Sequence, residues 1–87
     1  MELDPNEKKI PIIKIRDYLI VSIQVDMHDK LAVQLQSQIL TEIERTGAKG
    51  VLIDISVLEM VDSFIGRMLS GMASMAAIMD AAVVIVG

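Results

Sequence analysis

Two short apolar segments constrain the fold of this chain more than any other feature, because each follows a stretch with helical periodicity. Residues 51–55 are apolar except for one acid, and residues 82–86 are apolar throughout. Such runs are typical of strands that are buried on both faces, which are usually parallel. We therefore expect an α/β fold with the order strand, helix, strand, helix, strand, right-handed crossovers, and helices that flank the sheet.

The front of the chain has a two-residue periodicity instead. Apolar residues alternate with Lys14 and Arg16, and then with Ser22 and Gln24, around a short polar break at Arg16 and Asp17. This pattern predicts an antiparallel hairpin with one buried face. The hairpin precedes the three parallel strands, so the sheet is expected to be mixed.

Two stretches between the strands have apolar residues at helical spacing. In the first, we expect Asp29 to cap the start and Gly47 to end the helix. The second begins near residues 62–63 and runs to about Met79. Its apolar stripe contains four methionines: Met68, Met72, Met75 and Met79. We interpret this stripe as core packing against the sheet, and an adaptable protein-binding groove is the minority alternative.

Composition narrows the class of protein. The 87 residues have room for one small domain, which we place at 10–87 after a flexible lead-in at 1–9. A net charge of −4 and only two aromatic residues argue against a nucleic-acid partner. The absence of cysteine excludes disulfides and thiolate metal sites, and the single His28 cannot form a zinc site alone. With no visible signal peptide or membrane span, we expect a soluble cytoplasmic protein without a membrane partner.

The sequence supplies too few helices to cover both faces of the expected sheet. The chain stops at Gly87, directly after a strand that we expect to be central. A parallel sheet needs helices over both faces, and the pattern supplies only two helices. An apolar sheet face should therefore remain open, and we expect the chain to self-associate, by exchange of elements for example, to cover it.

The sequence offers little for catalysis. A nucleophilic serine needs a base within reach and an oxyanion hole, but the only histidine precedes the first helix. There is no G-x-S-x-G elbow and no glycine-rich phosphate loop. A hydrolase is therefore disfavoured, and we expect neither enzymatic activity nor a cofactor.

One serine occupies a position of functional interest. Ser63 lies where the loop after the strand at 51–55 turns into the second helix, and functional groups in α/β sheets gather beyond the carboxyl ends of strands. The simpler interpretation is that Asp62 or Ser63 is an N-cap, which contributes roughly 0.5–2 kcal/mol. The alternative is a phosphorylation site, because a phosphate there would lie at the positive end of the helix dipole.

The charge of such a phosphate would act on nearby groups. It would add about −1.5 to −2 charges beside several acids and could expel a partner that packs on the apolar surface around it. The residues that we assign to partner binding near this switch are Asp54, Glu59, Asp62, Phe64, Ile65 and Gly66.

Residues 51–55 followed by 60–66 (Met-Val-Asp-Ser-Phe-Ile-Gly) resemble the STAS domains of bacterial anti-sigma-factor antagonists. Residues 9–14, 19–24 and 46–51 narrow this resemblance to the RsbS-type scaffold subunits of the stressosome. The broader family usually carries Asp-Ser-Ser-Gly where this chain has Asp-Ser-Phe-Ile. The similarity extends from Lys9 to the end of the chain.

The resemblance implies a non-catalytic scaffold in a bacterial stress-signalling complex. It implies that Ser63 is phosphorylated by an RsbT-type serine kinase of the GHKL type, which stays bound until that phosphorylation. It also implies co-assembly with RsbR-type STAS subunits and resetting of the serine by an RsbX-type phosphatase.

Members of this family usually continue beyond the position of Gly87 with a helix, a strand and a final helix. The resemblance therefore implies an incomplete STAS domain. A second interpretation stays open: a STAS-like domain that senses a small anionic ligand or nucleotide at the same helix N-terminus.

Overall fold

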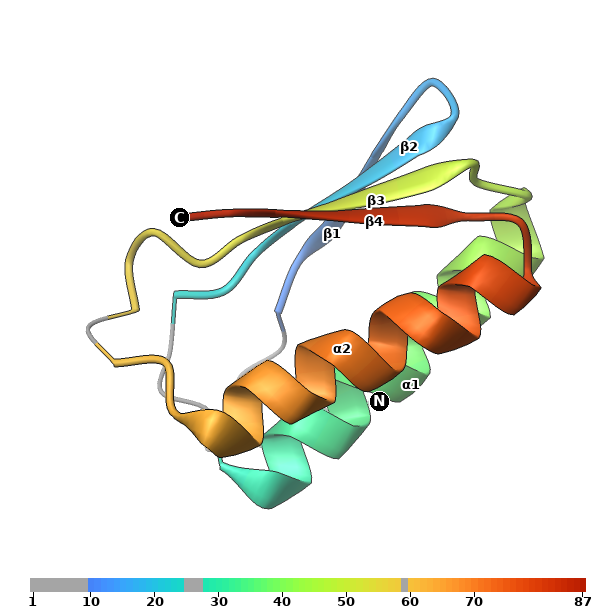
Figure 1. Cartoon of the computed structure of the whole chain (residues 1–87). Coiled ribbons are helices and arrows are strands. Elements are labelled where there is room, and N and C mark those ends of the chain that lie inside the picture. Colours follow the sequence, from blue (N-terminus) through green and yellow to red (C-terminus); the bar gives the residue numbers. More distant parts are fainter. Residues whose placement is uncertain (1–9, 25–27, 59) are drawn as a thin grey trace, which may run out of the picture.

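The computed structural model describes residues 10–24, 28–58 and 60–87, which form a four-stranded sheet and two helices (Figure 1). The sheet order is β1-β2-β3-β4, with β1 antiparallel to β2, and with β3 and β4 parallel to β2. The predicted mixed sheet, front hairpin and element order are confirmed. The elements are β1 (Ile12–Ile15), β2 (Tyr18–Ser22), α1 (Asp29–Thr46), β3 (Gly50–Asp54), α2 (Ser63–Ile78) and β4 (Ala82–Val86).

Both helices cover the same face of the sheet (Figure 1). The strands β2, β3 and β4 lie side by side in chain order, and crossovers of one hand that proceed in one direction place their helices on one side. Covering both faces requires a reversal of strand order, as in doubly wound sheets. The two helices therefore leave the other face of the sheet uncovered, as the sequence predicts.

The core lies between the covered sheet face and the two helices. Alternate residues of β2 and β3 point into it, and α1 contributes one apolar stripe. No polar side chain is buried among the described residues, so packing of aliphatic and methionine side chains holds the layers together. The largest fully buried side chains are Leu19, Ile23, Leu35, Ile39, Ile53 and Met72.

The ends of α1 depart from expectation at one residue. The N-cap is His28, whose Nδ1 accepts a hydrogen bond from the Leu31 backbone N–H at 3.3 Å, and Asp29 is already helical. The expected Asp29 cap is therefore wrong by one position. Gly47 ends the helix as predicted, because its left-handed backbone (φ 68°) lets its N–H donate to the Ile43 carbonyl at 2.8 Å.

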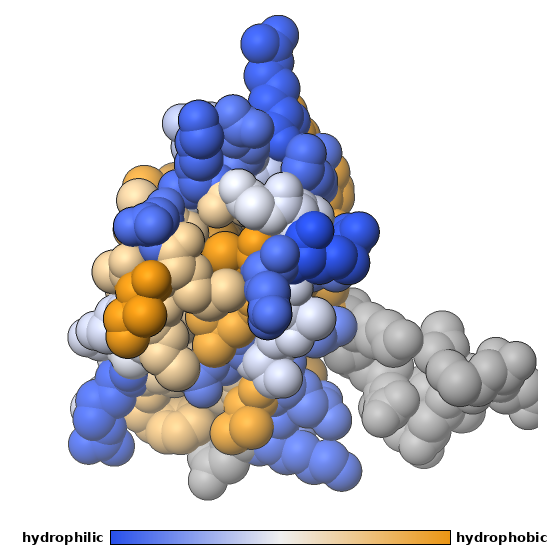
Figure 2. Space-filling view, turned by 90° about the vertical axis from the view of Figure 1, so that its right-hand side faces the viewer, coloured by the Kyte–Doolittle hydropathy of each residue, from blue (hydrophilic) through white to orange (hydrophobic). Residues whose placement is uncertain are grey.

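The methionine stripe of α2 is only partly core. Met68 and Met72 are buried, whereas Met79 is half-buried and Met75 is exposed. At 100° per residue, the buried arc of α2 is centred near Met72 and Ala76, and Met75 lies at its border. Exposed apolar side chains gather at the end of the molecule where α2 ends, between hydrophilic groups (Figure 2).

The two apolar strands are buried on one face only. Leu52 of β3 is half-buried, and Val84 of β4 is 54% exposed. β4 also lies at an edge of the sheet rather than at its centre. The prediction of strands buried on both faces is therefore wrong, whereas the expected open apolar sheet face is present.

Candidate functional site

Ser63 is the first residue of α2, and its side chain is exposed. The parallel strands end at one edge of the sheet and the helices run back along it, so both helix N-termini lie at the same end of the molecule (Figure 1). The Ser63 hydroxyl is thus close to the positive end of the α2 dipole. This end of the molecule favours added negative charge.

The cap of α2 is made by the neighbour of this serine. Asp62 is the N-cap, and its Oδ1 accepts a hydrogen bond from the Ile65 backbone N–H at 3.0 Å. The Asp62 carbonyl accepts the N–H of Gly66 at 3.0 Å. Within the described residues, the Ser63 hydroxyl makes no hydrogen bond. The sequence left open whether Asp62 or Ser63 caps the helix, and the structure shows that Asp62 is the N-cap.

Asp54 shapes the loop that leads to the site. It is the last residue of β3, and its Oδ1 accepts the Ser56 backbone N–H at 2.9 Å. The Ser56 hydroxyl and then the Ser56 backbone N–H hold the pKa of the Asp54 carboxyl below its usual value. Asp54 is therefore ionised at neutral pH, and its hydrogen bond with the Ser56 N–H holds the start of the loop after β3.

The three assigned residues after Ser63 have different environments. Ile65 is only 4% exposed, so its side chain packs into the core and not on the surface. Phe64 is half-buried against the core. Gly66 is exposed, and a Cβ added there would meet nothing within 4 Å, so open space adjoins the serine one turn along the helix.

The exposed apolar surface beside Ser63 comes from the loop before the helix, which the sequence reasoning missed. Met60 is 78% exposed, and Val61 is 45% exposed. Met60 and Val61 belong to no strand-like or helix-like apolar pattern in the sequence. Apolar residues in such a loop are not expected to join the core, so their exposure could have been predicted from the sequence. Glu59, which we assigned to partner binding, lies outside the described residues.

One cation lies close to Ser63 along the helix. Arg67 follows Ser63 by four residues on α2 and is exposed. Side chains at this spacing are neighbours on a helix surface. Among the described residues, no group of three histidines, cysteines or acids could hold a metal ion. None of the described helices is long and apolar enough to cross a membrane.

Comparison with known proteins gave matches among solved structures only. No family model matches the chain, and no curated protein sequence matches it. A serine-to-glutamate variant of RsbS from Moorella thermoacetica is 33% identical, with a TM-score of 0.78 over 90% of this chain and 66% of that chain. A chain from a structure described as the molecular architecture of the stressosome, a signal integration and transduction hub, is 37% identical. That match has a TM-score of 0.72 and covers 86% of this chain and 65% of the other.

A third structure shares the fold at low sequence identity. The NMR structure of the protein TM1081 is 13% identical, with a TM-score of 0.77 over 98% of this chain and 68% of that chain. It shows the fold alone. The chain spans about two thirds of the length of the RsbS and stressosome chains that it matches.

Proposed function

From the premise that this chain belongs to the STAS-domain proteins of the RsbS type, we propose that it is a phospho-acceptor scaffold of a stress-signalling complex. It binds an RsbT-type serine kinase until that kinase phosphorylates Ser63, and it has no catalytic role of its own. The observation that supports this proposal most directly is an exposed serine at the first position of α2 whose helix is capped by another residue.

The fold can accept a phosphate at this position. Asp62 supplies the cap, so modification of the Ser63 hydroxyl removes no hydrogen bond that the described residues show. A phosphate would carry about −1.5 to −2 charges at the positive end of a helix of 16 residues. Arg67 would offer it a cation one turn along. The modified domain should therefore stay folded, which a reversible switch requires.

The same phosphate should oppose a bound partner. The serine adjoins an apolar exposed surface at Met60 and Val61, which suits a contact that excludes water. Burying a phosphate dianion there, beside the carboxylate of Asp62, carries a desolvation and repulsion penalty. That penalty would release the kinase. The Moorella thermoacetica relative was solved with glutamate in place of a serine, a change that likewise adds negative charge at a serine position.

The proposal also covers the other partners of the chain and the compartment in which they meet. The partners are RsbR-type STAS subunits, which co-assemble with the chain, and an RsbX-type phosphatase, which resets the serine. The complex works in the cytoplasm. These partners belong to the whole protein, and this chain spans about two thirds of its solved relatives.

Mass spectrometry after incubation with an RsbT-type kinase and Mg-ATP tests the proposal. We expect a single phosphate on Ser63, none in Ser63→Ala, and normal modification of Ser70→Ala, the matched control at another exposed serine of α2. We also expect Ser63→Asp to bind the kinase more weakly than the unmodified chain. Transfer to Ser70 instead, or wild-type kinase affinity of Ser63→Asp, would contradict the switch.

The alternative function has its own readout. If the N-terminus of α2 senses an anion, inorganic phosphate or a nucleotide should raise the melting temperature without any kinase. Such stabilisation, together with no transfer to Ser63 in this chain or in a longer relative used as a control, would favour ligand sensing over phosphorylation.

A further inference from the structure

Helix α2 carries a single charged residue. Between Ser63 and Ile78 every residue is apolar, glycine or serine except Arg67, which is exposed. Neither of the two ion pairs among the described residues includes it. This guanidinium therefore has five N–H donors and no carboxylate on its own helix to bind.

The direction of side chains on a helix places this guanidinium over Ser63. Side chains of an α-helix lean toward its N-terminus, so a residue covers the surface of the turn before it. Residues at i and i+4 have Cβ atoms about 5–6 Å apart, and an anion at i with a cation at i+4 is the more favourable order. A phosphate on Ser63 and the guanidinium of Arg67 meet both conditions.

The helix surface beside these two residues is open. Gly66, which precedes Arg67, is exposed, and a Cβ added there would meet nothing within 4 Å. The acid that caps the helix, Asp62, is already engaged, because its Oδ1 accepts the Ile65 N–H at 3.0 Å. Asp62 also lies five positions before Arg67, outside the spacings at which helical side chains are neighbours. No acid of the helix or of its cap therefore competes with a phosphate for this guanidinium.

We infer that Arg67 is the residue that holds the phosphate of phosphorylated Ser63, through paired N–H···O bonds from its planar guanidinium. The inference rests on the proposed phosphorylation of Ser63 and names the group that receives its product. The role is one of positioning, since Arg67 fixes where the phosphate lies and takes no part in the transfer. Arginine suits this role better than lysine, because its fork of donors matches two phosphate oxygens at once.

The capture of Arg67 reverses the charge of α2. The unmodified helix has one positive charge, from Arg67, and a phosphate adds about −1.5 to −2 charges. A partner that meets this surface thus loses a cation and finds an anion in its place. The ion pair also favours the dianion over the monoanion, so the phosphate should keep its full charge as the pH falls toward its ordinary pKa of about 6.

Other charged and titratable groups at this end of the molecule act on the phosphate whether or not Arg67 is present. They are the carboxylates of Asp54 and Asp62, and the side chains of His28 and Lys30 at the start of α1. The first N–H groups of α2 attract the phosphate as well. The test must therefore measure the difference that Arg67 makes, rather than the pKa of the phosphate alone.

Replacement of Ser63 by phosphoserine during translation makes the test independent of any kinase. ³¹P NMR then follows the phosphate resonance from about pH 4 to 9 in the modified wild type and in modified Arg67→Gln. We expect the midpoint to be roughly 0.2–0.5 pH unit higher in Arg67→Gln, the shift that an ion pair at this spacing produces. Arg67→Lys should recover part of the difference, since it keeps the charge and loses the fork.

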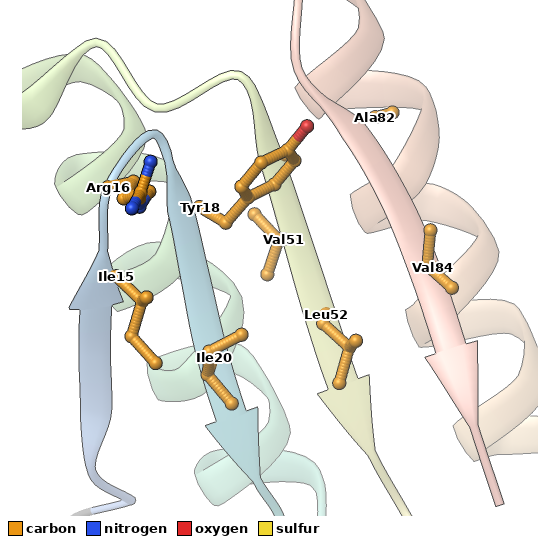
Figure 3. Close-up of a pocket in the computed structure, with 9 residues that line it drawn as sticks. Ile15, Arg16, Tyr18, Ile20, Val51, Leu52, Ala82 and Val84 are labelled. Carbon is orange, nitrogen blue, oxygen red and sulfur yellow. The ribbon is translucent and has the colours of Figure 1, made fainter.

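Arg16→Gln is the matched control, because it removes the same group at the opposite end of the sheet. Arg16 lies in the turn between β1 and β2, away from the ends of the strands that lead to Ser63 (Figure 3). The five residues of β3 span about 16 Å, which exceeds the Debye length of about 8 Å at physiological salt. The midpoint of the phosphate in Arg16→Gln should therefore equal that in the wild type.

Thermal unfolding gives a second, independent readout. The change in melting temperature on modification of Ser63 should be more favourable by about 1–4 °C in the wild type than in Arg67→Gln. A merely structural role of Arg67 would instead lower the melting temperatures of the modified and unmodified chains alike. That result would contradict the inference.

Equal midpoints in the wild type and Arg67→Gln would overturn the inference, and so would an equal shift in Arg16→Gln. The proposed function fails or stands separately. Transfer to Ser63 by an RsbT-type kinase, together with equal midpoints, would overturn the role of Arg67 and leave the switch standing. A shift specific to Arg67→Gln, in a chain whose Ser63 the kinase does not modify, would support the role of Arg67 and count against the switch.

Discussion

The division of roles between Asp62 and Ser63 gives the sharpest test of the site, because it concerns two adjacent residues. Asp62→Ala removes the acceptor for the Ile65 N–H, a part-buried hydrogen bond of 3.0 Å. Loss of an aspartate N-cap costs about 1 kcal/mol, within a range of roughly 0.5–2. In a domain of 60–100 residues, 1 kcal/mol lowers the melting temperature by about 4–8 °C.

Two further variants, Asp62→Asn and Ser63→Ala, separate the contributions of the Asp62 charge and the Ser63 hydroxyl from that of the capping hydrogen bond. Asp62→Asn keeps an N-capping oxygen and removes the charge, so it should lose only the helix-dipole contribution, about 0.3–1 kcal/mol at low ionic strength, and less in added salt. Ser63→Ala removes an exposed hydroxyl that caps nothing within the described residues. Its effect on the free energy of unfolding should stay within about 0.5 kcal/mol.

Urea and thermal unfolding followed by circular dichroism at two salt concentrations measure all three variants. The expected order of stability is wild type and Ser63→Ala together, then Asp62→Asn, then Asp62→Ala. If Ser63→Ala is as destabilising as Asp62→Ala, the serine shares the cap. Phosphorylation would then disturb the helix start, and the argument that the fold accepts a phosphate there would fail.

The other predictions concern the core, the helix surface and the loop. Leu69→Ala should lower the free energy of unfolding by about 2–5 kcal/mol in urea titration, because Leu69 is buried in α2; a loss below 1 kcal/mol would contradict its core role. Gly66→Ala should raise the melting temperature, with about 0.5–1 kcal/mol of added stability, because a Cβ there meets nothing; a lower melting temperature would refute this. Because the pKa of Asp54 is depressed in the folded state, its contribution to stability is present above its unfolded pKa of about 3.9 and is lost as pH falls through the folded pKa. Asp54→Asn should therefore flatten the acid limb of the stability–pH curve below about pH 4, and an unchanged acid limb would argue against the hydrogen bonds from Ser56 as the cause.

Local patterns predicted the elements well, because the signals for a hairpin, an amphipathic helix and a glycine terminus are short in range. Gly47 ends α1 as expected, and α2 begins within the expected pair of residues. The error at the start of α1 has a local cause as well. A histidine is an unusual N-cap, and its Nδ1 accepts the bond that an aspartate one position later was expected to accept.

The burial of the two apolar strands could not be predicted in the same way. An apolar run such as β4 has the same sequence whether one or both of its faces meet other residues. What decides the cover is the direction in which successive strands are added, and that is a property of the whole topology. Ile65 illustrates a similar limit, since the motif around Ser63 does not say which apolar side chain faces inward.

The topology also keeps Ser63 apart from the sheet surface that is turned away from the helices, because Ser63 lies on the helix layer (Figure 1). A phosphate on Ser63 therefore meets the groups at the start of α2 and not the exposed side chains of that sheet surface. We expect Leu52→Lys to leave phosphorylation of Ser63 unchanged. Asp54 connects the two regions, because it ends β3 and accepts the Ser56 N–H in the loop before α2, so Asp54→Asn is the substitution in the sheet that should change the rate of phosphorylation.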